Sequence, residues 1–182
     1  MRFSYEQGPI RPPSEAKSLL IRVTRNCPWN KCAFCHTYRD TKFQIRSVQD
    51  VKADIQKAKD IADQIKEISW KIGQEGRINE FVVNYIYQND GFYNDSFKGI
   101  AAWLFFGGKS VFLQDADTII IKQMIWLKLF CFLKNSFLTL TGLPHTVGQR
   151  RRAESLLKIL KVSIMPASQG FMLGWKAAMI PF

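Results

Sequence analysis

The sequence of 182 residues predicts an α/β fold built on a parallel sheet. Two short segments, 19–23 and 110–114, are nearly continuous in apolar residues, which is typical of strands buried on both faces. Between them, the segment 47–73 repeats apolar residues at helical spacing. A strand, then helices, then a second strand favour parallel pairing of the two strands.

The first predicted strand, Leu19 to Val23, follows an irregular start that contains Pro9, Pro12 and Pro13. A loop from Thr24 to about Arg46 comes next and holds three of the four cysteines. The strand therefore leads directly into the segment that is richest in chemically reactive side chains.

Ser47 is predicted to cap the longest helix, and Gly73 to end it. Its apolar stripe is Val51, Ile55, Ala58, Ile61 or Ala62, Ile65, Ile68 and Ile72. A second, weaker helix is predicted from Asn79 through Ile86, and a third from a cap at residues 94–96 to residues 107–108. The core stripe expected for the third helix is Ile100, Trp103, Leu104 and Phe106. The second strand, 110–114, then ends in the acidic turn 115–117.

Charge is distributed unevenly along the chain, whose formal net charge is +11. Residues 1–117 hold 17 Lys/Arg against 14 Asp/Glu, whereas residues 118–182 hold nine Lys/Arg and one acid, Glu154. A basic surplus often indicates nucleic acid or anionic lipid. The only dense basic run is 150–152, which a solvated loop explains equally well, so nucleic acid is not an expected partner.

Neither a signal peptide nor a membrane span is expected. The first ten residues lack an apolar core of the signal-peptide kind. The most apolar segment, 118–143, is interrupted by Lys122, Lys128 and Lys134. Four cysteines are too few for a disulfide scaffold, and their clustering indicates metal binding in a reducing compartment. We therefore expect a cytoplasmic protein.

Cys27, Cys32 and Cys35 form a C-x4-C-x2-C triplet within nine residues. Thiolates are soft ligands, so zinc and iron–sulfur clusters are the natural occupants, and three unligated core cysteines are the plainer alternative. Structural zinc needs a fourth ligand, but His36, His145 and Cys131 all lack ligand spacing. Three ligands on a four-iron cluster would leave one iron open for a small molecule. Cys131, between two phenylalanines, is predicted to be inert.

The segment 25–35, Arg-Asn-Cys-Pro-Trp-Asn-Lys-Cys-Ala-Phe-Cys, resembles the radical S-adenosylmethionine (radical SAM) family. It is similar to an Arg-Gly-Cys-Pro-Trp-Asn-x-Cys-x-Phe-Cys form of one uncharacterised branch. Segments 11–16, 43–47 and 112–117 resemble that branch as well. The sequence departs from the commonest family spacing, C-x3-C-x2-C, by one residue, and Asn26 stands where glycine is usual.

The resemblance implies the N-terminal portion of a partial (β/α)6 barrel, incomplete in this chain. It implies that Cys27, Cys32 and Cys35 hold a [4Fe-4S] cluster that reductively cleaves S-adenosylmethionine to a 5′-deoxyadenosyl radical. Phe34 would lie by the adenine, and Asp115 and Asp117 would lie near the methionine amine. The alternative for these two carboxylates is a solvated acidic turn. An electron donor such as a flavodoxin or ferredoxin, and an unidentified small-molecule or macromolecular substrate, are the implied partners.

The resemblance stops near Lys122, where the basic, acid-poor segment begins. Regrouping its codons one base earlier forces Glu from Trp175-Lys176 and Asp from Met179-Ile180, and permits Gly-Leu-Glu-Ser-Gly-Asn-Asp, which is similar to the family's Gly-x-Glu-Ser segment. We therefore predict that residues 1–122 are the N-terminal part of a radical SAM domain and that residues 123–182 are out of frame. The alternative is a divergent C-terminal region.

A different class of protein also fits the cysteine pattern. The three thiols together with His36 could hold zinc, and the basic tail could contact nucleic acid. Metal content and colour distinguish the two hypotheses, because iron–sulfur protein is brown and contains acid-labile sulfide.

Overall fold

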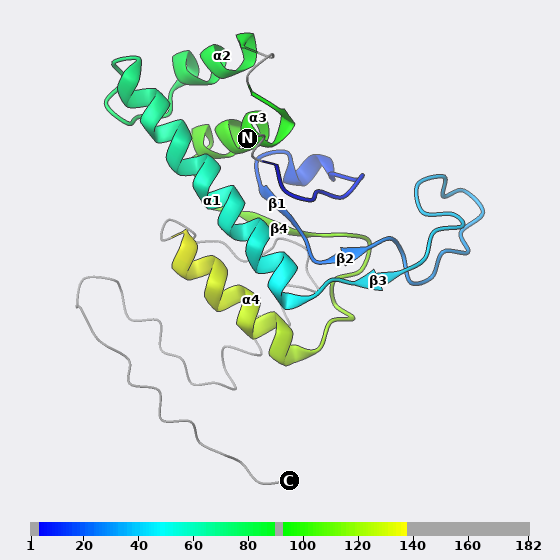
Figure 1. Cartoon of the computed structure of the whole chain (residues 1–182). Coiled ribbons are helices and arrows are strands. Elements are labelled where there is room, and N and C mark those ends of the chain that lie inside the picture. The colour runs from blue at the N-terminus through cyan, green and yellow to red at the C-terminus, as the bar shows by residue number, and fades with distance from the viewer. Residues whose placement is uncertain (1–3, 90–92, 138–182) are drawn as a thin grey trace, which may run out of the picture.

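The computed structural model describes residues 4–89 and 93–137, in which two parallel strands pack with four α-helices (Figure 1). A 3-10 turn, η1, spans Pro13–Glu15. The other elements in chain order are β1 (Leu19–Arg22), β2 (Thr24–Arg25), β3 (Gln44–Ile45), α1 (Val48–Lys71), α2 (Glu80–Gln88), α3 (Asp95–Phe105), β4 (Val111–Gln114) and α4 (Gln123–Ser136).

β1 and β4 pair in parallel, in a register that runs from Leu19 opposite Val111 to Arg22 opposite Gln114. All four residues of β4 are buried, as are the first three of β1, which explains why both segments are nearly continuous in apolar residues. Both predicted strands and their parallel pairing are confirmed. The fold class is accordingly mixed α/β with a small parallel sheet.

The longest helix, α1, begins and ends as its sequence predicts. The Ser47 hydroxyl accepts a hydrogen bond from the Asp50 amide at 3.1 Å, which satisfies a donor that the first turn leaves unpaired. At the other end Gly73 has φ +76°, and its amide donates to the Trp70 carbonyl at 3.1 Å. This left-handed closure strongly favours glycine.

The next two helices use the same local chemistry, with one correction. Asn79 and Asn94 cap α2 and α3, each accepting a hydrogen bond from an amide three residues later at 3.1 Å. Phe106, expected in the core stripe of α3, is 48% exposed. It is the C-cap residue, past the last turn, where Lys17 Nζ lies 4.5 Å from its ring centre.

The apolar face of α1 forms the centre of the core. Figure 1 shows α4 alongside the N-terminal half of this helix and α3 toward its C-terminal half, with the sheet behind it. The stripe predicted for α1 is confirmed, with Ile68 and Ile72 partly rather than fully buried. Its fully buried members are Val51, Ile55, Ala58, Ile61, Ala62 and Ile65.

The last described helix, α4, was not expected from the sequence pattern. Trp126, Leu129 and Leu133 are buried, and the Trp126 indole N–H donates to the Thr118 carbonyl at 3.0 Å. These residues begin the segment that we predict to be out of frame, and its remainder, 138–182, lies outside the described residues. Within 4–89 and 93–137, no helix is long and apolar enough to cross a membrane.

Candidate metal and cofactor site

The three clustered cysteines lie in a loop at the carboxyl end of the parallel sheet. We call residues 26–43 the cysteine loop; it leaves β2 and returns through β3, and the two strands pair antiparallel. The Arg46 amide donates to the Val23 carbonyl at 3.1 Å, which closes the base of the loop. Figure 1 shows the loop projecting away from the helices. Ligand sites of α/β proteins gather at this end of the strands.

Polar side chains join the two arms of the cysteine loop. The Asn26 side-chain amide donates to the Lys42 carbonyl at 2.7 Å, and that of Asn30 donates to the Thr41 carbonyl at 2.8 Å. Asn26 has φ +66°, in the left-handed region that glycine adopts most readily and asparagine tolerates. Glycine would adopt this conformation at least as readily as asparagine does.

Cys27, Cys32 and Cys35 are all free thiols of intermediate exposure. The Cys35 amide donates to the Cys32 carbonyl at 3.2 Å, so these two residues share a turn. In the described part of the chain, no three His, Cys, Asp or Glu side chains converge as metal ligands. The donor set fits a thiolate-bound metal centre, whereas the observed side-chain positions do not gather the thiols at one point.

The aromatic side chains of the loop face solvent. Phe34 is 83% exposed and Trp29 is 65% exposed, and Lys31 Nζ lies 5.9 Å from the centre of the Trp29 ring. Exposed aromatics beside unpaired thiols supply flat apolar surface for a ligand. That Phe34 contacts adenine stays a prediction.

Asp115 lies at the carboxyl end of β4, and its carboxylate accepts hydrogen bonds on both oxygens. The Tyr38 hydroxyl donates to Oδ1. Arg22 Nη2 donates to Oδ2 at 2.7 Å, and the Asn26 amide donates to the same oxygen at 3.3 Å. The side chain is 1% exposed, so the Arg22 charge offsets the desolvation of the carboxylate. Sequence reasoning selected Asp115 but not its partners.

Asp117 differs from Asp115 in its surroundings. It is half-buried, and its Oδ1 accepts a hydrogen bond from the Ile119 amide at 2.9 Å, which is the local bond of an Asx turn. Thr24 connects the two acidic positions: its hydroxyl accepts from the Asp115 amide at 3.1 Å and lies 3.5 Å from the Asp117 carbonyl. The Asp117 carboxylate is thus the more accessible of the two, whereas that of Asp115 is buried among its partners, and a contact of either with a cofactor stays a prediction.

Tyr38, three residues after Cys35, is buried although its neighbours in the loop are exposed. Burial raises the pKa of its hydroxyl, and the hydrogen bond to Asp115 and the charge of that carboxylate raise the pKa further. The hydroxyl consequently stays protonated and remains a donor at neutral pH.

Glu6 and three arginines form an ionic cluster at the base of the cysteine loop. The sequence pattern did not predict this cluster. Glu6 Oε1 accepts from Arg22 at 3.1 Å and from the Arg25 Nε at 2.6 Å, and its Oε2 lies 2.6 Å from Arg25 Nη2 and 3.4 Å from Arg46 Nε. The hydrogen bonds from Arg25 hold the pKa of Glu6 below its usual range. Arg25 and Arg46 belong to segments that resemble the family, but Glu6 does not, and only the folded backbone brings the three side chains together.

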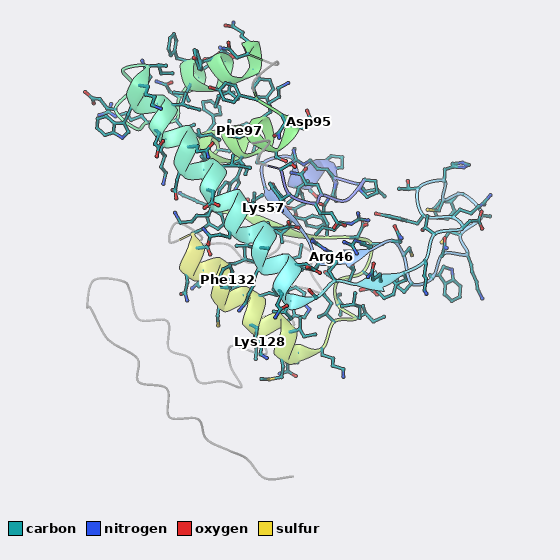
Figure 2. All side chains as sticks on the ribbon, in the orientation of Figure 1. Arg46, Lys57, Asp95, Phe97, Lys128 and Phe132 are labelled. Atoms are coloured by element: carbon teal, nitrogen blue, oxygen red, sulfur yellow. The ribbon has the colours of Figure 1, made fainter. Side chains whose placement is uncertain are left out.

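Arg46 connects this cluster to α1. Its Nη2 lies 2.7 Å from Asp54 Oδ2, and its Nη1 donates to the Arg22 carbonyl at 2.7 Å. Figure 2 shows Arg46 beside the first turns of α1, with Lys57 further along that helix. A cavity of about 500 Å³ adjoins the pair. Its lining is Ser4, Tyr5, Glu6, Arg25, Arg46, Asp50, Ala53, Asp54 and Lys57.

Comparison with protein-family models, curated proteins and solved structures finds no match to this chain. The case for a function therefore rests on the cysteine loop, on the residues that hold it, and on the resemblance of its motif.

Proposed function

We propose that the chain is the N-terminal part of a radical SAM enzyme and that Cys27, Cys32 and Cys35 bind a [4Fe-4S] cluster. The observation that carries the proposal is the position of the triplet: three unpaired, partly exposed thiols in one loop at the carboxyl end of a parallel strand. We further propose that the β1–β4 pair belongs to a partial (β/α)6 barrel, which the resemblance of the motif implies.

In this proposal the thiols must reach one centre, so binding must draw the loop together. Loop residues 27–37 make few bonds to the rest of the protein, whereas the base of the loop is held by β2, β3 and Asp115. Movement within the loop is therefore compatible with a fixed base. Thiolates are the form that binds iron, so metal binding releases the protons of the thiols.

The bound cluster and S-adenosylmethionine would supply one-electron cleavage of the sulfonium, to give methionine and a 5′-deoxyadenosyl radical that removes hydrogen from a substrate. The protein's own groups bind and orient. Phe34 offers an exposed aromatic face for the adenine, and Asp117 offers a carboxylate for the methionine amine. We also propose an electron donor, such as a flavodoxin or ferredoxin, as the partner that supplies the electron.

The test is anaerobic reconstitution of the full chain with iron and sulfide, followed by measurement of bound iron, acid-labile sulfide and visible absorbance. Wild type is expected to become brown, and Cys32→Ala is expected to lose most of its bound iron and sulfide. Cys131→Ala is the matched control, because Cys131 is exposed on α4, away from the loop. Equal iron and sulfide in wild type and Cys32→Ala would refute the ligand assignment, and colourless wild type with zinc would support the zinc-module hypothesis.

A further inference from the structure

The carboxylate of Asp115 contacts the cysteine loop on both sides of the three cysteines. On one side the amide of Asn26, the residue before Cys27, donates to Oδ2 at 3.3 Å. On the other side the Tyr38 hydroxyl, three residues after Cys35, donates to Oδ1. One buried side chain on β4's carboxyl end therefore fixes both limits of the segment that holds all three thiols.

The contacts of Asp115 differ in whether strand pairing also holds the segment that each of them attaches. Arg22 and the Asn26 amide lie at the base of the loop, which the β2–β3 pairing also holds. Tyr38 is different, because no strand pairing holds the segment 30–43 near the sheet. Its side chain is buried against Asp115, whereas Ala33, Phe34 and His36 are exposed. The bonds from Asn26 to Lys42 and from Asn30 to Thr41 join the two arms to each other, whereas the Tyr38 hydroxyl attaches the second arm to the end of β4.

We propose that Tyr38 is a positioning residue for the metal centre: its hydrogen bond to Asp115 holds the Cys32–Cys35 turn at the carboxyl edge of β4. This inference rests on the proposed function. Asp115 then serves the site by holding the loop, since both of its carboxylate oxygens already accept bonds within the protein. In this role neither residue has to contact the metal.

The physical effect is pre-organisation. A loop held at two points explores fewer conformations, so a larger fraction of the molecules has its thiols within reach of one centre. The apparent dissociation constant of a metal centre rises in proportion as that fraction falls. A hydrogen bond from a neutral donor to a buried carboxylate is strong enough to change the fraction roughly ten-fold.

The test uses Tyr38→Phe, which removes the hydroxyl and keeps the ring that fills the buried site. Two measurements are made on the full chain. The first is amide hydrogen exchange of residues 27–37 in the metal-free protein. The second is the rate of iron release to a chelator from reconstituted protein, together with the electron paramagnetic resonance spectrum of the reduced cluster with and without S-adenosylmethionine. Tyr87→Phe is the control, because Tyr87 is an exposed tyrosine on α2.

We expect Tyr38→Phe to unfold at nearly the wild-type urea concentration, to exchange its loop amides roughly ten-fold faster and to release iron faster by a similar factor. Its resonance spectrum should broaden or shift, which a purely structural role would not cause. Wild-type exchange and wild-type iron release in Tyr38→Phe would overturn the proposal. If Tyr38→Phe exchanges its loop amides faster but the wild type binds no iron, the proposed function is refuted. Tyr38 then holds the loop without serving a metal centre.

A second variant tests the same hydrogen bond from its acceptor end, and its iron release alone is measured if Tyr38→Phe unfolds as a whole. Asp115→Asn keeps the shape of the acceptor and removes its charge. In a double-mutant cycle the two changes should be strongly non-additive for iron release, because both act on one hydrogen bond. Additive effects would show that the two residues act separately and would also overturn the proposal.

Discussion

The Tyr38 hydroxyl donates a hydrogen bond to Oδ1 of Asp115 across 77 residues of sequence. The bond joins the cysteine loop to the carboxyl end of β4, the strand that pairs with β1. Arg22, the last residue of β1, donates to the other oxygen of the same carboxylate. The buried carboxylate of Asp115 therefore holds both the edge of the sheet and the cysteine loop. A change at this carboxylate should affect both.

Alkaline pH should destabilise the protein partly through Tyr38. The pKa of Tyr38 is raised in the folded state, whereas an unfolded tyrosine ionises near pH 10 (about its ordinary value). Above about pH 10 the unfolded chain therefore binds fewer protons, and the free energy of unfolding falls as pH rises. Urea unfolding across this range should show a shallower decline for Tyr38→Phe than for wild type.

Part of the alkaline decline should persist in that variant. Burial also raises the pKa of Tyr5, so this tyrosine contributes in the same direction. Identical pH profiles for Tyr38→Phe and wild type would show that the hydroxyl of Tyr38 is not held in its neutral form by the fold.

Acid pH should destabilise the protein partly through Glu6. Hydrogen bonds from Arg25 lower the pKa of Glu6 in the folded state, so its contribution is present above the ordinary glutamate pKa of about 4.3 and is lost as pH falls through the lowered value. Glu6→Gln should reduce the free energy of unfolding at neutral pH by about 1 kcal/mol, a modest effect because the side chain is 28% exposed.

The control for this prediction is Glu67→Gln, since Glu67 is exposed on α1. Chemical unfolding at pH 7 and at about pH 3 separates the two variants, because the difference between Glu6→Gln and wild type should become smaller at the lower pH. A difference from wild type that is the same at both values would contradict the assignment of charge to Glu6.

Helix α4 should contribute to stability through its buried face. Leu129 is 3% exposed, and Leu129→Ala should cost about 2–5 kcal/mol of unfolding free energy through lost burial and the cavity left behind. Met124→Ala on the same helix should cost little, because Met124 is 63% exposed. Thermal or urea unfolding of both variants measures the contrast. Equal midpoints would show that α4 does not pack on α1 in solution.

Resequencing the coding DNA across codons 115–182 and past the stop tests the reading-frame prediction. We expect an inserted or deleted base near the codon for Lys122, with the regrouped frame running on. The restored protein would then be the one to assay anaerobically for cleavage of S-adenosylmethionine. A frame confirmed as written, with early stops in the regrouped frame, would show that the basic segment is genuine and that its surface needs a partner.

Residues close together in sequence determined most of the secondary structure. The caps Ser47, Asn79 and Asn94 and the closing glycines act within one helical turn, so their chemistry can be read from the sequence. The prediction that Phe106 lies in the core was wrong because the apolar period continues past the residue at which α3 ends. α4 was missed because Lys122 supplies no side-chain cap at its start.

The sequence by itself determined the α/β class, the positions of β1, β4 and the helices α1 to α3, and the cysteine triplet, because apolar periodicity, capping and ligand spacing are local properties. Only the tertiary structure decided that Asp115 accepts hydrogen bonds from Arg22, Tyr38 and Asn26, and that Glu6 joins Arg25 and Arg46. Ion pairs and hydrogen bonds between distant residues depend on the path of the backbone. That path is set by the burial of the α1 face against the sheet and its neighbouring helices, which no single segment encodes.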